Sequence, residues 1–96
     1  TAPHSAQGPV CSLVCAHLNA ATPNFFLHEI FDDFNVPWEK DLLTRHAVVK
    51  DGHVQLPTGP GIGAELNHEE IAKHPYELGH YIPLFRQGWE RREGVG

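Results

Sequence analysis

His4 and Glu29 are the two residues of this chain whose types and spacing best fit acid–base chemistry. His4 ends a short extended stretch before a helical run at residues 9–21, and Glu29 ends the apolar stretch that follows this run. In a parallel α/β unit both strand ends lie at one edge of the sheet, where such proteins build active sites. An imidazole transfers protons near neutral pH, and a protonated carboxyl group donates a hydrogen bond. The pattern therefore predicts a proton-transfer site.

A single helix is predicted to connect the two strands. Pro9 suits a first helical turn, and Pro23 ends the run. Helical spacing predicts one buried apolar stripe, formed by Val10, Leu13, Val14, His17, Leu18 and Ala21. Because His17 lies on this stripe, we expect it to be a packed, hydrogen-bonded histidine rather than a metal ligand.

The second strand is predicted over residues 24–30, which are apolar enough for burial on both faces of a parallel sheet. His28 alternates to the face opposite Glu29, so we expect it to pack rather than to react. The aromatic and acidic residues 31–38 that come next have no period and predict a loop at the active-site edge. A short helical turn is expected at residues 39–44.

The second half of the chain carries local turn and capping signals. Asp51-Gly52 between two alternating stretches predicts a hairpin over residues 47–56. Asn67, with Glu70 three residues later, predicts a capped helix that ends before Pro75. The aromatic residues 76–96 lack helical periodicity and predict an extended tail that lies over another surface.

Composition excludes several classes of protein. The chain has 96 residues and a net charge of −5, and without a basic stripe it is not expected to bind nucleic acid. No apolar run approaches the roughly 20 residues of a membrane helix, and there is no signal-peptide pattern, so no membrane partner is expected. Cys11 and Cys15 share a helix face at a spacing that strains a disulfide. We expect free thiols in a reducing cytosol and therefore a cytoplasmic protein.

The predicted elements do not form a complete core. A strand that is apolar on both faces needs partners at both edges, and only one helix is long enough to cover it. The chain also begins with Thr1 rather than Met. We therefore expect these residues to belong to a larger α/β fold.

The motifs, taken in order, resemble the mandelate racemase subgroup of the enolase superfamily, which includes many acid-sugar dehydratases. The resemblance begins with APH, GPV, HL, AATPNF and HE within residues 2–29. It continues with DG, LP, GPGIG and EL within residues 51–66, and ends with HPY at residues 74–76 and the aromatic tail. Each motif alone is weak, but the order and spacing cover nearly the whole chain.

This resemblance implies a C-terminal segment of a (β/α)8 barrel, with the end of strand 7, helix 7 and strand 8 in residues 1–46. Residues 47–96 would be the hairpin and tail that return to a capping domain. His4 matches a histidine that acts as general acid or base and is held by an aspartate from strand 6. Glu29 matches a glutamate that hydrogen-bonds the substrate carboxylate and stabilises the enediolate. Trp38 either lines the substrate pocket or is an interface aromatic.

The implied activity is that of a Mg²⁺-dependent acid-sugar dehydratase. It removes the proton alpha to a carboxylate and eliminates the 3-hydroxyl as water, which gives a 2-keto-3-deoxy acid. The dianionic intermediate needs a metal ion and a hydrogen-bond donor. The resemblance assigns the three carboxylate ligands of Mg²⁺ and the lysine base to residues upstream of Thr1. We therefore expect no metal ligand in this chain, and no activity from the 96 residues alone.

The expected partners are a small sugar acid, the remainder of the barrel and capping domain, and further copies of the full-length protein in a homo-oligomer. A racemase or epimerase of the same superfamily is the nearest alternative. A non-catalytic fragment or interaction module is the alternative from another class. In that reading His4 is an exposed terminal histidine and Glu29 forms an ordinary strand-end salt bridge.

Overall fold

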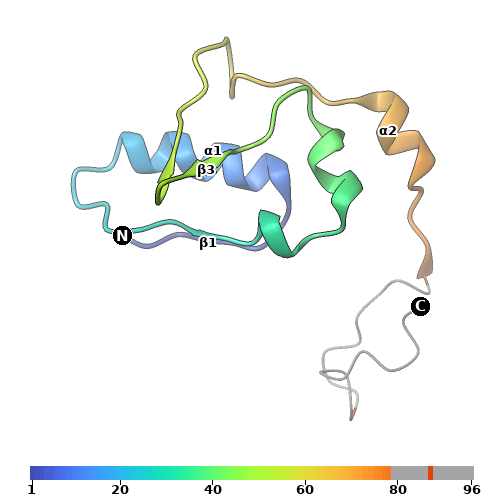
Figure 1. Ribbon diagram of the computed structural model, residues 1–96, viewed down its shortest axis with the longest axis horizontal. Helices are drawn as coiled ribbons and strands as arrows, with labels where there is room; N and C mark the ends of the chain where they lie inside the picture. The colour runs from blue at the N-terminus through green and yellow to red at the C-terminus, as the bar shows by residue number, and fades with distance from the viewer. Residues whose placement is uncertain (79–86, 88–96) are drawn as a thin grey trace.

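One helix lies along a pair of short parallel strands (Figure 1). The computed structural model describes residues 1–78 and residue 87. Strand β1 (His4–Ser5) leads into helix α1 (Pro9–Ala20), and strand β2 (Glu29–Ile30) then returns beside β1 in parallel. This is the β–α–β order that the sequence predicts. None of the helices within the described residues is long and apolar enough to cross a membrane.

The ends of α1 agree with the sequence to within one residue. Gly8 precedes the helix with a φ of 102°, a conformation that a side chain would oppose, and Pro9 occupies the first turn. At the other end, the hydroxyl of Thr22 donates to the carbonyl of Leu18 at 2.7 Å. Local signals therefore determine where this helix begins and ends.

The predicted buried stripe of α1 is wrong in part. Leu13 is buried as predicted, but Val10, Val14 and Leu18 are exposed, with Leu18 at 56%. The helix instead buries the face formed by Pro9, Ser12, Leu13, Ala16 and Asn19. This face looks toward the strands and the hairpin, because the described residues place no second helix against the other side of α1. The apolar side chains on that side remain without a covering layer in this part of the chain.

The predicted strand over residues 24–30 is shorter than expected. Only Glu29–Ile30 is regular strand, although the amide of Phe26 donates to the carbonyl of Thr1 at 2.8 Å. Phe26 is 78% exposed rather than buried on both faces. Within the described residues β2 pairs with β1 alone, so the backbone groups along only one of its edges have a strand partner.

A small hairpin lies on the same buried face of α1 as the strands. Strands β3 (Val49–Lys50) and β4 (His53–Val54) pair antiparallel around Asp51 and Gly52, whose φ values are 51° and 74°. Two successive positive φ values define the type I′ turn that Asp-Gly favours. The core cluster joins the helix to the residues before and after the hairpin: it contains Leu13, Leu43 and Ala47, with Ile30, Val54, Ile62 and Ala64 packed around it.

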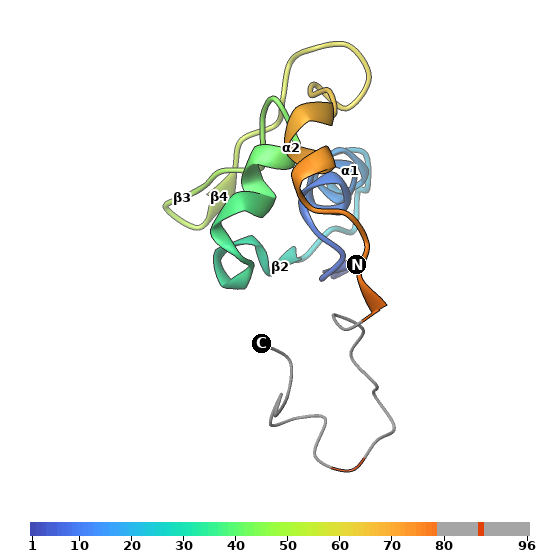
Figure 2. The same ribbon diagram turned by 90° about the vertical axis from the view of Figure 1, so that its right-hand side faces the viewer.

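Short helical segments complete the described fold. After β2 come two 3₁₀ segments, η1 (Asp32–Phe34) and η2 (Pro37–Leu42), so the predicted helical turn begins earlier than residue 39. Helix α2 (His68–Lys73) lies beside η2 (Figure 2), and the Asn67 side chain accepts from the amide of Glu70 at 3.3 Å, as the capping pattern predicts. Most of the predicted tail lies outside the described residues. Its return to a capping domain, and the division at residue 46, stay predictions.

Leu13 is the residue on which the core depends most. Its side chain is 0% exposed and contacts the residues that connect the strands to the hairpin. Replacing Leu13 with Ala is expected to lower the free energy of unfolding by about 2–5 kcal/mol, because it leaves a cavity in packed surroundings. Urea unfolding measures this loss. Lys40→Ala, at an exposed position, is the control and should change the free energy of unfolding by less than about 0.5 kcal/mol. Equal stability of the two variants would contradict the central place of Leu13 in the core.

Candidate functional site

The parallel pairing of β1 and β2 brings His4 and Glu29 together. The two residues are paired directly across the two strands, so their side chains start from neighbouring positions. Nδ1 of His4 forms a hydrogen bond with Oε2 of Glu29. The side chains are 61% and 48% exposed, respectively, so a small molecule can reach both groups. The structure thus joins the two residues that the sequence singles out, across 25 positions of the chain.

This hydrogen bond leaves one ring nitrogen of His4 for chemistry. Within residues 1–78, Nε2 has no hydrogen-bond partner, whereas Nδ1 is engaged by Glu29. When Nδ1 carries the proton and donates it to Glu29, the lone pair of Nε2 is free to accept a proton. The second oxygen of Glu29, Oε1, forms no hydrogen bond within the described residues. An imidazole and a carboxyl group therefore lie side by side, each with one atom open to a ligand.

An aromatic ring borders the pair. Phe31, two residues after Glu29, meets the His4 ring edge-on with centroids 5.6 Å apart and an interplanar angle of 76°. Phe34 in η1 lies 6.2 Å from Phe31. The Phe31 ring therefore covers one side of the imidazole and limits the directions from which a ligand can approach it.

Trp38, the third predicted site residue, contacts helix α2. Its indole stacks on the His74 ring with centroids 3.6 Å apart and an interplanar angle of 6°. His74 in turn bonds Glu70, whose pKa is lowered by its hydrogen bonds to Lys73 and then to His74. The described residues record no contact of Trp38 with His4 or Glu29. A structural role in holding η2 against α2 is therefore the one that the geometry supports.

A buried polar network, which the sequence analysis missed, lies behind the His4–Glu29 pair. Ser12 on α1 donates to Oδ1 of Asp32 at 2.7 Å, and its oxygen lies 3.2 Å from the hydroxyl of Ser5. The exposed fractions of Ser5 and Ser12 are only 1% and 0%. Burial, followed by the charge of Asp32, raises the pKa of the neighbouring Glu39. A polar residue beside Leu13 on the buried helix face was the available signal, but its partner stands 20 positions away.

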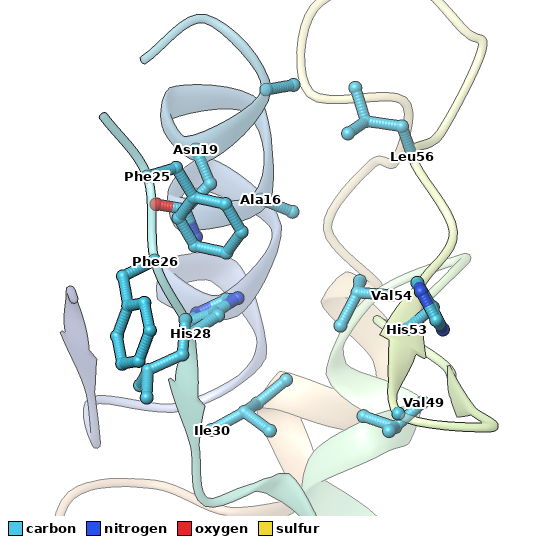
Figure 3. A pocket seen from close by; sticks show the side chains of 13 residues that line it. Ala16, Asn19, Phe25, Phe26, His28, Ile30, Val49, His53, Val54 and Leu56 are labelled. Carbon is cyan, nitrogen blue, oxygen red and sulfur yellow. The ribbon is translucent and has the colours of Figure 1, made fainter. Parts of the chain in front are cut away.

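A groove opens between α1, the approach to β2 and the hairpin (Figure 3). It has a volume of about 450 Å³ and apolar walls that include Phe25, Ile30 and Val54. Neither His4 nor Glu29 lines it. Both side-chain polar atoms of Asn19 and Nε2 of His28 are buried there without a partner in the described structure. Burial lowers the pKa of His28, which agrees with the predicted packing role.

The other candidate ligands do not assemble into a metal site. Cys11 and Cys15 are free, with sulfur atoms 3.9 Å apart, and burial raises the pKa of Cys15. His17 bonds the carbonyl of Ile62 at 3.1 Å, as a packed histidine does. Across residues 1–78 and 87, no group of three His, Cys, Asp or Glu side chains is arranged to hold a metal ion. The described residues therefore do not fit a Mg²⁺ site by themselves.

Comparison with protein families and curated proteins gives consistent matches. Residues 1–71 match the model of the enolase C-terminal domain-like family. A D-gluconate dehydratase of Thermoproteus tenax is 34% identical over 74 residues, which are 77% of this chain and 15% of that protein. A D-galactonate dehydratase family member of Streptomyces bingchenggensis is 36% identical over 95 residues, which are 96% of this chain and 21% of that protein.

Solved structures give the same fold. A putative L-alanine-DL-glutamate epimerase from Burkholderia xenovorans superposes with a TM-score of 0.74 at 33% identity, over 81% of this chain and 20% of the other. An enolase of the mandelate racemase subgroup from Agrobacterium tumefaciens superposes with a TM-score of 0.60 at 35% identity, over 75% and 19% of the two chains. The chain thus spans only 15–21% of the length of these four proteins.

Proposed function

This chain belongs to the enolase C-terminal domain-like family, and we propose that it is the C-terminal part of an acid-sugar dehydratase. The reaction removes the proton alpha to a carboxylate and expels the 3-hydroxyl as water, which gives a 2-keto-3-deoxy acid. Sugar-acid dehydratases among its relatives, at 34% and 36% identity, support this class of substrate. The segment would supply the end of strand 7, helix 7 and strand 8 of a (β/α)8 barrel, within a cytoplasmic enzyme.

The hydrogen-bonded pair formed by His4 and Glu29 is the observation that carries the proposal. We assign to Nε2 of His4 the transfer of a proton, either at the alpha carbon or to the departing 3-hydroxyl. We assign to Glu29 the hydrogen bond to the substrate carboxylate, which gains negative charge as the enediolate forms. A donor aimed at developing charge stabilises the transition state more than the ground state. Both side chains are accessible enough to perform these roles.

The rest of the barrel and a capping domain would cover the surfaces that this chain leaves open. The exposed apolar residues Val10, Val14 and Leu18 on α1 support a neighbouring helix, because water-exposed apolar stripes at helical spacing are uncommon on finished surfaces. The side-chain amide of Asn19, which is buried without a hydrogen-bond partner among the described residues, supports a polar partner in the groove. We also propose that the full-length protein assembles into a homo-oligomer.

The proposed metal ion would be bound by residues outside this chain. Enolase-superfamily members typically use Mg²⁺, and the described residues here lack a ligand set for it. We propose that carboxylates on earlier strands bind it. Asp32, Asp33 and Glu39 come after β2 and are not assigned to the metal.

A racemase or epimerase is the second candidate, because an epimerase is among the structures that superpose well. Both reactions begin with the loss of an alpha proton, and the His4–Glu29 geometry serves either. They differ in the second step: dehydration needs a leaving group at C3, whereas epimerisation returns the proton to the alpha carbon. The geometry of this segment serves both of these steps equally, and the sugar-acid relatives favour dehydration.

Substrate screening of the full-length enzyme tests the proposal. A panel of acid sugars with Mg²⁺ is expected to yield a 2-keto-3-deoxy product from at least one member, detected with semicarbazide. Exchange of the alpha proton in D₂O on a carboxylate, without any keto acid, would instead establish the racemase or epimerase reading. A native subunit mass near that of this chain alone would favour the non-catalytic module and would overturn both enzyme candidates.

A further inference from the structure

We propose that Ser12 and Asp32 are positioning residues that hold His4 in register with Glu29. The inference rests on the proposed function, since it names the parts of this chain that fix the geometry of its proton-transfer pair. The two reactive side chains stand on strands of only two residues each, which is little hydrogen bonding to define their relative position. Something else must fix the ends of these strands.

The polar network joins those ends directly. Ser5 follows His4 in β1, and Asp32 lies three residues after Glu29, at the start of η1. Ser12, on α1, lies between them and contacts both, so three segments of the chain meet at one hydroxyl group. A change at Ser12 therefore acts on both sides of the site at once.

The direction of the hydrogen bonds follows from the number of protons. Ser12 has one hydroxyl proton, and the carboxylate of Asp32 at 2.7 Å is a stronger acceptor than the carbonyl of Gly8 at 3.4 Å. The hydroxyl of Ser5, 3.2 Å away, must then donate to Ser12. The result is a chain from Ser5 through Ser12 to Asp32, in which each bond polarises the next.

The surroundings make this chain rigid and costly to break. Ser12 is completely buried and Ser5 is 1% exposed, so water cannot readily replace a lost partner. Asp32 also lies near the N-terminal end of the 12-residue helix α1, where a negative charge is favoured. Its other oxygen, Oδ2, is buried without a partner in the described residues, so the bond from Ser12 is the main restraint on this carboxylate.

Removing the hydroxyl of Ser12 is therefore expected to loosen the His4–Glu29 pair without changing either of its side chains. In the full-length enzyme with Mg²⁺, Ser12→Ala should lower kcat about 10–100-fold, as sub-ångström misplacement of reacting groups does. KM should change by less than about threefold, because substrate binding does not use this hydroxyl. Asp32→Ala should resemble Ser12→Ala, whereas Asp32→Asn keeps an acceptor for Ser12 and should lose less.

Thr22→Ala is the matched control, because Thr22 also bonds a backbone carbonyl of α1 but at the end away from the site. It should leave kcat unchanged. Rates are measured well below the melting temperature of each variant, as alpha-proton exchange in D₂O and as keto-acid formation. If the wild type exchanges the proton but forms no keto acid, the proposed dehydratase function fails, and the exchange rates still test the positioning role.

Crystal structures of the full-length wild type and the Ser12→Ala variant give a readout that needs no turnover. The imidazole of His4 is expected to move out of hydrogen-bond distance of Glu29, beyond about 3.5 Å, in the variant. An unmoved His4–Glu29 pair would overturn the proposal, and so would a wild-type kcat in Ser12→Ala together with a lower melting temperature. In that case Ser12 would serve stability alone.

Discussion

Replacing Glu29 with Gln in the full-length enzyme is expected to lower kcat by about 10²–10³-fold. The side chain keeps its size, but an amide is a weaker donor than a carboxyl group toward an oxygen that gains negative charge. In the variant, the amide also replaces the carboxyl group whose Oε2 forms the hydrogen bond with Nδ1 of His4. Steady-state turnover of the best acid sugar, with product read as the 2-keto-3-deoxy acid, measures the loss.

Binding of Mg²⁺ provides the control for this variant. Glu29 is the first residue of β2 and lies beside His4 rather than in a cluster of carboxylates, so the Mg²⁺ affinity should stay within about threefold of the wild type. Glu69→Gln, at an exposed position on α2, should retain full activity. A variant Glu29→Gln that loses Mg²⁺ would assign this side chain to the metal and would contradict the role proposed for it.

Local signals account for most of what could be predicted from the sequence. Gly8 and Pro9 define the start of α1, Asp51 and Gly52 define the turn of the hairpin, and Asn67 caps α2. In each case the physical cause of the element's boundary lies in one residue and its near neighbours. The cause is a φ value that the backbone requires or a backbone amide that needs a hydrogen-bond acceptor. These elements appear in the structure within a residue or two of their predicted bounds.

The buried face of α1 could not be predicted in the same way. Val10, Val14 and Leu18 are as apolar as Leu13, and periodicity alone makes them equivalent. Burial depends on what packs against the helix, and that is decided by segments far away in the chain. Within the described residues, the strands and the hairpin cover the Leu13 side only.

His4 and Glu29 differ from Ser12 and Asp32 in how far the sequence reveals their contacts. The catalytic roles of His4 and Glu29 stay a proposal, but their contact could be predicted, because the order of motifs places a reactive residue type at each of two successive predicted strand ends. The bond between Ser12 and Asp32 could not, since serine on a helix and aspartate in a loop are ordinary residues until the fold places them together. The contact of Trp38 with His74 could not be predicted for a related reason: the two residues stand 36 positions apart in the chain.

Replacing His4 with Asn is expected to have the largest effect on catalysis, a loss of about 10²–10⁴-fold in kcat. Asparagine can keep a hydrogen bond to Glu29, but it cannot take up or release a proton near neutral pH. His53→Asn is the matched control, because that histidine lies on the exposed hairpin and its ring bonds the backbone carbonyl of Asp51, two residues earlier. If His4→Asn retains activity, His4 is an exposed histidine near the terminus without a catalytic role.

The substrate can be altered to tell which proton His4 moves. A 3-fluoro analogue of the acid sugar loses fluoride, a leaving group that needs no proton from the enzyme. If His4 acts only as the acid for the 3-hydroxyl, His4→Asn should turn over this analogue at nearly the wild-type rate. If Nε2 also takes the alpha proton, the variant should fail with both substrates and should show no exchange in D₂O. The free Nε2 beside an engaged Nδ1 is compatible with either step, so this comparison assigns the proton to its atom.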